Sequence, residues 1–176
     1  MPTITHIPTS LYPQHYSHLP KKHAHAAENL LPYLKPGAHV LDVGSGSGYT
    51  LALFHYLVGP SGRVTGIEHM SELVAWSETN LRADGLGSAL DSGQIELICG
   101  DGREGFSKGA PYDAIHVGAA PPQLPAQLVE QLKAPGRMFI PVGTDRQQII
   151  QVDKDEDGNV TQKALLDVRV CYFFRS

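Results

Sequence analysis

Short apolar runs alternate along the chain with segments in which apolar residues recur at helical spacing. Each apolar run is bounded by turn residues and predicts a buried strand, at 40–43, 63–68, 95–99, 114–117 and 138–142. The segments between them predict helices at 24–34, 49–58 and 71–84. Strands that alternate with helices in this way indicate an α/β domain whose mostly parallel sheet is covered on both faces.

The last third of the chain changes character. Two strand-like stretches, 148–153 and 160–164, flank the turn-forming run Asp155-Glu156-Asp157-Gly158-Asn159. This pattern predicts a hairpin, and therefore antiparallel strands at one edge of the sheet. A further apolar and partly alternating stretch follows at 165–174. Within the helical segments, Ser71 is a candidate N-cap.

The composition fits one globular domain. A chain of 176 residues with 41% hydrophobic residues can bury a sizeable core. Residues 1–22 are expected to form an irregular arm, because prolines interrupt any helical period there, and 23–176 to form a single domain. The arm region is rich in histidine, but the spacing matches no metal-binding pattern, so we expect no metal.

Charge and cysteine content narrow the range of partners and compartments. A net charge of −4 gives no basic face for nucleic acid. No apolar run reaches the length of a membrane span, and the start of the chain lacks the layout of a signal peptide. Two cysteines make no disulfide framework and fit a reducing compartment. The expected location is therefore cytoplasmic, with neither a membrane nor a nucleic-acid partner.

The first predicted strand ends abruptly in a glycine-rich turn, Gly44-Ser45-Gly46-Ser47-Gly48, and a helix follows. Glycines allow a sharp turn and the close approach of a ligand, and a helix start offers unpaired N–H groups. The glycines alternate here, with Asp42 two residues before them, whereas dinucleotide-binding turns have the spacing GxGxxG. Alternating glycines after VLDV are typical of class I methyltransferases that bind S-adenosylmethionine. A tight strand–helix turn without a ligand is the alternative.

Other unusual residues also fall at predicted strand ends, where ligands bind in open parallel sheets. Glu68 and His69 close the second strand, and a carboxylate there can accept hydrogen bonds from both hydroxyls of a ribose. Asp101, between two glycines, can meet the exocyclic amine of a purine. His116 precedes the small residues 117–121, which leave a floor for a ligand. Each of these is alternatively an ordinary polar turn or a packed strand end.

Longer segments carry a more specific signal: LLPYLKPGAHVLDVGSGSGY, GRVTGIEH, GDGREGF, PYDAIHVGAAPP and APGRMFIPVG. They cover most of residues 19–165 and resemble the protein-L-isoaspartate O-methyltransferase family in its eukaryotic, fungal form. The resemblance implies a doubly wound, Rossmann-like class I S-adenosylmethionine-dependent methyltransferase fold. It also implies a carboxyl O-methyltransferase that methylates the free α-carboxylate of an isoaspartyl residue and releases S-adenosyl-L-homocysteine. The methyl ester then collapses to a succinimide, so that damaged aspartate is partly repaired.

The resemblance also implies roles for individual residues. The turn residues would line the methionine and ribose parts of the cofactor, Glu68 would hold the ribose hydroxyls with His69 beside them, and Asp101 with Gly102 would meet the adenine. The complete expected cofactor site is His23, Asp42, Gly44, Ser45, Gly46, Ser47, Gly48, Glu68, His69, Asp101, Gly102 and His116.

The chain departs from the family in the segments that grip the substrate. Family members carry a longer region before the matched part. Aligned on Pro20 and His23, the serine that contacts the reacting carboxylate in the family becomes His18, and Ser17 replaces it only if the loop shifts by one residue. The family's final segment is also altered, to Val168-Arg169-Val170-Cys171-Tyr172-Phe173-Phe174. His18 and Ser17 are therefore the candidate catalytic residues.

Three functions remain open from the sequence. The first is an isoaspartyl methyltransferase of reduced size, acting on a peptide or protein. The second is a biosynthetic enzyme for a small-molecule carboxylate or hydroxyl, in which His18 serves as a base, or as a hydrogen-bond donor in a cyclase or isomerase without methyl transfer. The third is an inactive cofactor-binding or interaction protein with a dimer contact at 172–174. We expect a monomer or a homodimer.

Overall fold

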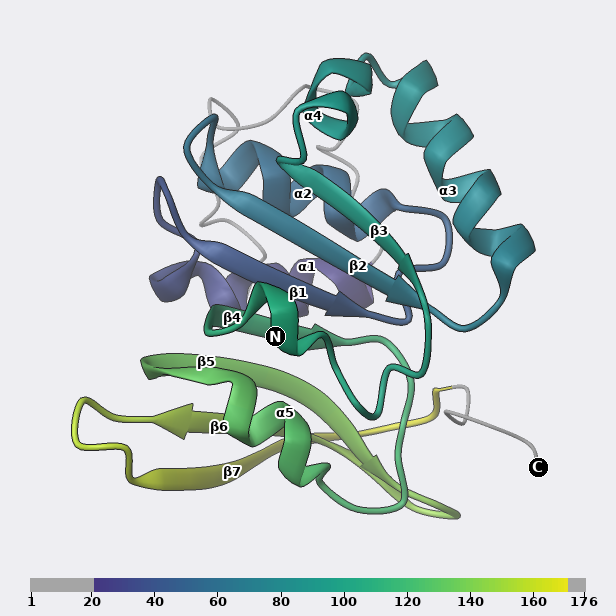
Figure 1. Ribbon diagram of the computed structural model, residues 1–176. Coiled ribbons are helices and arrows are strands. Elements are labelled where there is room, and N and C mark those ends of the chain that lie inside the picture. Colours follow the sequence, from purple (N-terminus) through teal and green to yellow (C-terminus); the bar gives the residue numbers. More distant parts are fainter. Residues whose placement is uncertain (1–20, 171–176) are drawn as a thin grey trace.

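The computed structural model describes the backbone of residues 21–170 and the side chains of residues 25–170. A seven-stranded sheet forms its centre, and Figure 1 shows helices on either side of it. The strands are β1 (His39–Val43), β2 (Arg63–Glu68), β3 (Ile95–Cys99), β4 (Tyr112–Val117), β5 (Leu132–Gly143), β6 (Gln147–Lys154) and β7 (Val160–Val168). The helices are α1 (Lys21–Leu30), α2 (Tyr49–Val58), α3 (Ser71–Ala83), α4 (Gly87–Asp91) and α5 (Ala126–Gln131), with 3₁₀ turns at Leu31–Tyr33 and Ser107–Gly109.

The strand order is β3-β2-β1-β4-β5-β6-β7. The first five strands of this order pair in parallel, while β6 is antiparallel to both β5 and β7. This confirms the mostly parallel sheet and the antiparallel hairpin at its edge. The chain runs outward from β1 to β3 on one side and from β4 to β7 on the other. The order therefore reverses between β1 and β4, which is where open α/β sheets bind ligands.

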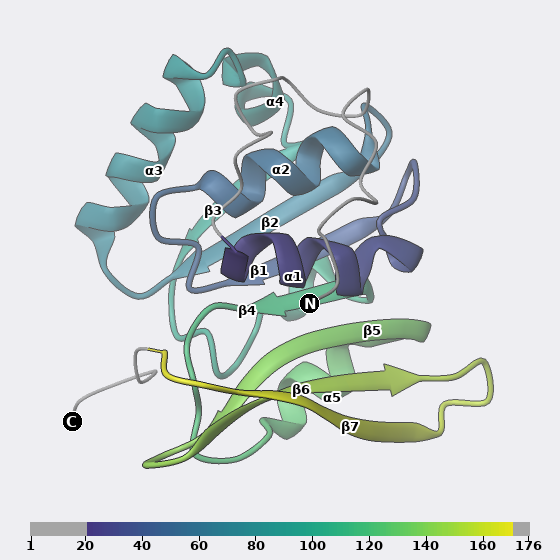
Figure 2. The same ribbon diagram turned by 180° about the vertical axis from the view of Figure 1, so that it is seen from behind.

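Two apolar layers hold the sheet between the helices. The first lies under α1, α2 and α3 and includes Leu30, Phe54 and Leu81, each buried. Figure 2 shows α1 and α2 in front of the sheet on this side. The second layer lies on the opposite face under α5, seen in front in Figure 1, and includes Ile115 and Leu128. Both faces are therefore covered, so the central strands read as nearly continuous apolar runs.

Some element boundaries differ from those expected. The helix predicted at 24–34 begins earlier, at Lys21, and its α-helical part ends at Leu30. A 3₁₀ turn follows because Pro32 has no N–H group to continue the helical ladder. The short helices α4 and α5 were not predicted, since neither is long enough to show a helical period.

The proposed N-cap at Ser71 is wrong. The cap position of α3 is Met70, whose side chain makes no capping hydrogen bond; the Ser71 hydroxyl lies 3.1 Å from a Glu72 carboxylate oxygen. The Glu68 carboxylate accepts the backbone N–H groups of both residues that precede the helix. Glu68 thus fixes the chain before α3, and Ser71 becomes the first helical residue.

Most of the arm predicted at 1–22 lies outside the described residues, as do residues 171–176. Within 21–170, no helix combines the length and apolar character needed to cross a membrane.

Candidate functional site

The carboxyl ends of the central strands are tied to one another through the backbone. The Gly44 N–H donates to the Ile67 carbonyl across the β1–β2 boundary, at 2.8 Å. On the other side of β1, the Gly118 N–H donates to the Val43 carbonyl at 2.8 Å. A Cβ on Gly118 would come within 3.2 Å of the Gly44 carbonyl oxygen. The loops after β1, β2 and β4 therefore form one continuous edge at the switch point, the place between β1 and β4 where the strand order reverses.

The glycine turn is shaped differently at its two ends. Gly44 has a φ of 77°, and a Cβ there would meet nothing within 4 Å, so the start of the turn faces open space. Gly48 has a φ of 82°, but a Cβ there would come within 2.6 Å of the buried Ser77 hydroxyl on α3. Asn80 on the same helix donates to the Ser47 carbonyl at 3.0 Å. Helix α3 therefore holds the far end of the turn, while its start stays free to receive a ligand.

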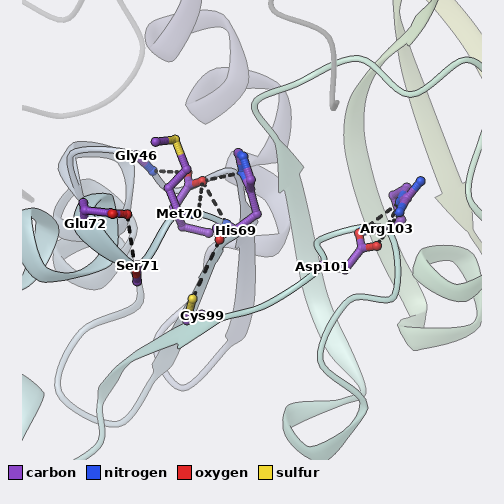
Figure 3. Close-up of polar contacts among 9 residues, drawn as sticks. Gly46, His69, Met70, Ser71, Glu72, Cys99, Asp101 and Arg103 are labelled. Atoms are coloured by element: carbon purple, nitrogen blue, oxygen red, sulfur yellow. Dashed lines mark hydrogen bonds and ion pairs between the residues drawn. The ribbon is translucent and has the colours of Figure 1, made fainter. Parts of the chain in front are cut away.

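Glu68 is the polar centre of this edge. The residue is only 6% exposed. Its Oε2 accepts the Gly46 N–H at 3.2 Å, and its Oε1 accepts the N–H groups of His69 at 2.8 Å and Met70 at 3.3 Å. The His69 ring nitrogen Nδ1 also lies 2.8 Å from Oε1, with that side chain half exposed. Figure 3 shows Gly46, His69 and Met70 gathered here. The carboxylate links the end of β2 to the glycine turn.

Asp101 lies at the end of the neighbouring strand but faces another partner. Arg103 donates to both carboxylate oxygens, with Nη2 to Oδ2 at 2.6 Å and Nε to Oδ1 at 3.1 Å. Hydrogen bonding from this guanidinium is the main cause that lowers the pKa of Asp101. Figure 3 shows the Asp101–Arg103 pair apart from the residues around His69. Gly102, beside it, is buried. A role of Asp101 toward a purine stays a prediction.

Asp42 and His116 are brought together, although they are 74 positions apart in the sequence. Their strands are adjacent and pair them directly, and Asp42 Oδ1 lies 2.6 Å from His116 Nδ1. Asp42 is only 1% exposed, on the face that α1 and α2 cover. The expectation that both residues contact the cofactor stays a prediction. In the structure, His116 also borders a neighbouring pocket.

This pocket, of about 250 Å³, opens beside Gly118 at the carboxyl ends of β4 and β5. We call it the β4 pocket. Its lining combines two histidines with mainly apolar residues: His25, His116, Val117, Gly118, Phe139, Pro141, Ile149, Leu166, Val168 and Val170. Gly118 lines this pocket and also lies against the start of the glycine turn, so the turn and the pocket are neighbours.

The candidate catalytic residues His18 and Ser17 lie outside the described residues. His23 belongs to the first turn of α1, but its side chain is also outside them. Among the described residues, no group of three or more histidine, cysteine, aspartate or glutamate side chains is arranged to hold a metal ion.

Two residues of the site were missed from the sequence. His25, on α1, lines the β4 pocket, and Asn80, on α3, holds the glycine turn. The signal for Asn80 was a polar residue next to the buried Leu81, in the helix that follows the strand end at Glu68. The signal for His25 was its position two residues after His23, but only tertiary structure shows that it reaches the pocket.

Comparison with known proteins identifies the family. A family model described as "Protein-L-isoaspartate(D-aspartate) O-methyltransferase (PCMT)" matches residues 3–173. A protein-L-isoaspartate O-methyltransferase of Triticum aestivum is 49% identical over 150 residues, which are 85% of this chain and 65% of that protein. A protein of the same name from Caenorhabditis elegans is 47% identical over 146 residues, 82% of this chain and 64% of the relative. The chain thus spans less than two thirds of the length of these relatives.

The fold agrees with a solved structure of the same kind. A putative protein-L-isoaspartate O-methyltransferase from Plasmodium falciparum, in complex with S-adenosyl-L-homocysteine, superimposes with a TM-score of 0.81 at 28% identity. The match covers 89% of this chain and 75% of that one. This confirms the doubly wound methyltransferase fold expected from the sequence. The family model, the relatives and the shared fold agree, and the chain belongs to the protein-L-isoaspartate O-methyltransferase family.

Proposed function

We propose that this chain is an S-adenosyl-L-methionine-dependent carboxyl O-methyltransferase that acts on isoaspartyl residues in peptides or proteins. The observation that carries the proposal is the joined edge at the switch point. There, the glycine turn (44–48) and Glu68 form a polar corner, which we call the glycine corner. Gly118 connects it to the β4 pocket. A cofactor and an acceptor chain in these two places would bring their reacting ends together.

The residues of the corner fit the cofactor. The open space over Gly44 leaves room for a ligand against the backbone. The Glu68 carboxylate lies beside that space and can accept hydrogen bonds from two adjacent hydroxyls, as a ribose presents them. Asn80 and Ser77 keep the turn in place from the side of α3. Bound there, S-adenosyl-L-methionine would supply a methyl group on a positively charged sulfur, which becomes a neutral thioether when a carboxylate oxygen takes the methyl.

The protein's own contribution is mainly positioning. A carboxylate is already a nucleophile, so no side chain has to remove a proton from it, and alignment of the reactants supplies most of the acceleration. The small residues that follow β4 leave the backbone free to approach the acceptor. The apolar lining of the β4 pocket would exclude water around the reacting carboxylate. Any part played by His18 or Ser17 stays a prediction.

A transfer assay tests the proposal directly. Purified protein is incubated with S-adenosyl-L-methionine labelled in the methyl group, together with an isoaspartyl hexapeptide or its normal aspartyl isomer. We expect base-labile label on the isoaspartyl peptide alone, since only that isomer carries a free α-carboxylate within the chain. Label on neither peptide would overturn the proposal. Label on a small carboxylic acid offered in parallel, but on neither peptide, would favour the biosynthetic alternative.

We also propose that the protein works in a reducing, cytoplasmic compartment. Cys99 is a free and exposed thiol, which such a compartment keeps reduced. A monomer or homodimer remains the expectation. The dimer contact suggested at 172–174 lies outside the described residues.

A further inference from the structure

The Asp42–His116 pair is an unusual feature of the interior. A carboxylate that is 1% exposed lies in the middle of the sheet, and its Oδ2 is buried without a hydrogen-bond partner among the described residues. Among the described residues, the hydrogen-bond partner of its other oxygen is His116 Nδ1, at 2.6 Å. Burying a carboxylate with so few hydrogen bonds lowers the free energy of unfolding. The pair therefore calls for an explanation other than the stability of the sheet.

The ring of His116 is fixed in one orientation. Phe54, from α2, meets it edge-on with ring centroids 5.9 Å apart, and Phe139, from β5, stacks on it at 6.3 Å. With Asp42 holding Nδ1, the ring has little freedom to turn. Its Cε1 atom lies 3.9 Å from the place that a Cβ on Gly118 would take, so this edge of the ring faces the end of β4. The neighbouring Nε2 has no hydrogen-bond partner among the described residues.

The two ring nitrogens of His116 can serve two carboxylates at once. As an imidazolium, which carries a proton on each nitrogen, the ring would donate from Nδ1 to Asp42 and from Nε2 to a carboxylate bound in the pocket. The other titratable group that lines the pocket is His25 of α1, and the lining residues from β5, β6 and β7 are apolar. The His116 ring is therefore a candidate partner for a carboxylate in a mainly apolar pocket.

We propose that His116 is a positioning residue, held by Asp42, whose Nε2–H donates a hydrogen bond to the acceptor carboxylate in the β4 pocket. The oxygen that accepts this bond is the one that does not take the methyl group, so the other oxygen is turned toward the glycine corner. The inference rests on the proposed function, because it assumes a carboxylate acceptor. It assigns the recognition of that carboxylate to a residue of β4 within the described part of the chain.

The variant His116→Asn separates this role from a structural one. The asparagine amide can still donate to Asp42 from the position of Nδ1, but nothing replaces Nε2. We expect the KM for an isoaspartyl hexapeptide to rise about 10- to 100-fold, the range for loss of a hydrogen bond to a charged group. We expect kcat to fall less, and the calorimetric affinity for S-adenosyl-L-homocysteine to stay within about twofold, because the glycine corner is untouched. An unchanged KM in a folded variant would overturn the inference and reduce the pair to a structural element.

A matched control is His39→Asn, which makes the same replacement at the opposite end of β1. Only the backbone N–H of His39 has a described hydrogen bond, to Asp113, so the variant should leave KM and kcat unchanged. A comparable rise in KM for the control would mean that the assay responds to sheet stability, and this result would overturn the assignment.

A second measurement uses the unaltered protein. The ring nitrogens of ¹⁵N-labelled histidine are followed by NMR in protein saturated with S-adenosyl-L-homocysteine, while the isoaspartyl hexapeptide or its aspartyl isomer is added. We expect the Nε2 signal of His116 to move with the isoaspartyl peptide only. If the wild-type protein methylates the isoaspartyl peptide and this signal stays fixed, the inference fails and the proposed function stands. If there is neither methylation nor a shift, both fail.

Discussion

The two halves of the site are built on different principles. The glycine corner consists largely of backbone groups: the turn at Gly44, its N–H bond to Ile67, and the one side chain of Glu68 that joins them. The β4 pocket consists of side chains from α1, β4, β5, β6 and β7, and most of them are apolar. The corner is assembled from two adjacent strands and their loops, whereas the pocket needs elements from nearly the whole length of the described chain.

This difference indicates how each half tolerates change. In the corner, the positions of the groups follow from a backbone conformation that only glycine adopts readily, so most substitutions there should affect the cofactor. In the pocket, apolar side chains of similar volume can replace one another at small cost, while His116, paired with Asp42 beneath it, cannot be exchanged so easily. A family can therefore keep its glycine corner while substitutions in the pocket change which acceptor molecule binds there.

The largest expected effect comes from the corner. Glu68→Gln keeps the size of the side chain but removes its charge and one acceptor for the ribose hydroxyls. Because hydrogen bonds to charged groups contribute about 1.5–3 kcal/mol each, the affinity for S-adenosyl-L-homocysteine should fall about 100-fold. Calorimetric titration measures it. Glu72→Gln, at the exposed start of α3, is the control and should bind normally. Equal affinities would show that the ribose is held elsewhere.

Next is the packing of the glycine turn against α3. Gly48→Ala combines a φ of 82° with a contact of 2.6 Å to Ser77. Gly85→Ala has nearly the same φ, 83°, but a Cβ there would meet nothing within 4 Å. Both should lose about 1–2 kcal/mol in free energy of unfolding because of the left-handed backbone. Gly48→Ala should lose roughly 1–3 kcal/mol more through the clash. Urea denaturation compares the two, and equal losses would mean that α3 moves aside without penalty.

A smaller effect is expected at Asp101, and it tests how far the corner extends. If its carboxylate meets the adenine, Asp101→Asn should weaken S-adenosyl-L-homocysteine binding about 5- to 10-fold, the value of one hydrogen bond. Arg103→Gln removes only the exposed partner of that carboxylate, and its affinity should change less than about twofold, since exposed ion pairs contribute little. If neither variant changes the affinity, Asp101 does not contribute to cofactor binding, and the glycine corner extends no further than Glu68.

The smallest effect belongs to the apolar wall of the pocket. Leu166, on β7, lines it and is 42% exposed. Leu166→Ala removes partly buried methyl groups and should raise the KM for the isoaspartyl peptide about 2- to 5-fold without a change in cofactor affinity. Val160→Ala is the control, because it lies on the same strand with similar exposure, 40%, but does not line the pocket. If cofactor affinity falls in Leu166→Ala, the two halves are not independent.

The sequence predicted the parallel strands, the C-terminal hairpin and the glycine turn between β1 and α2 well. Each of these has a local signal: an apolar run of strand length, a turn-forming run, or alternating glycines next to a strand. The boundaries at Leu30 and Met70 were less predictable. Pro32 shortens the first helix, and the Glu68 carboxylate takes over the role expected of a Ser71 cap. A side chain that reaches along the chain to fix a helix start leaves no periodic signal.

The arrangement of the β4 pocket could not be predicted in the same way. Asp42 and His116 were both singled out from the sequence as cofactor contacts, because each lies at or near a strand end, and that role stays a prediction. That they face each other follows from the parallel pairing of β1 with β4, whose residues are 74 positions apart. His25 lines the same pocket as His116 because α1 packs on the same face of the sheet.

The sequence by itself determined the fold class, the family and the place where the cofactor is expected, because these depend on short runs whose backbone conformation is set by neighbouring residues. Only the tertiary structure decided that Asp101 faces Arg103, that α3 holds the glycine turn through Asn80, and that a buried carboxylate directs a histidine into an apolar pocket. These contacts join elements distant in sequence. Their geometry is set by strand pairing and helix packing, which no local pattern specifies.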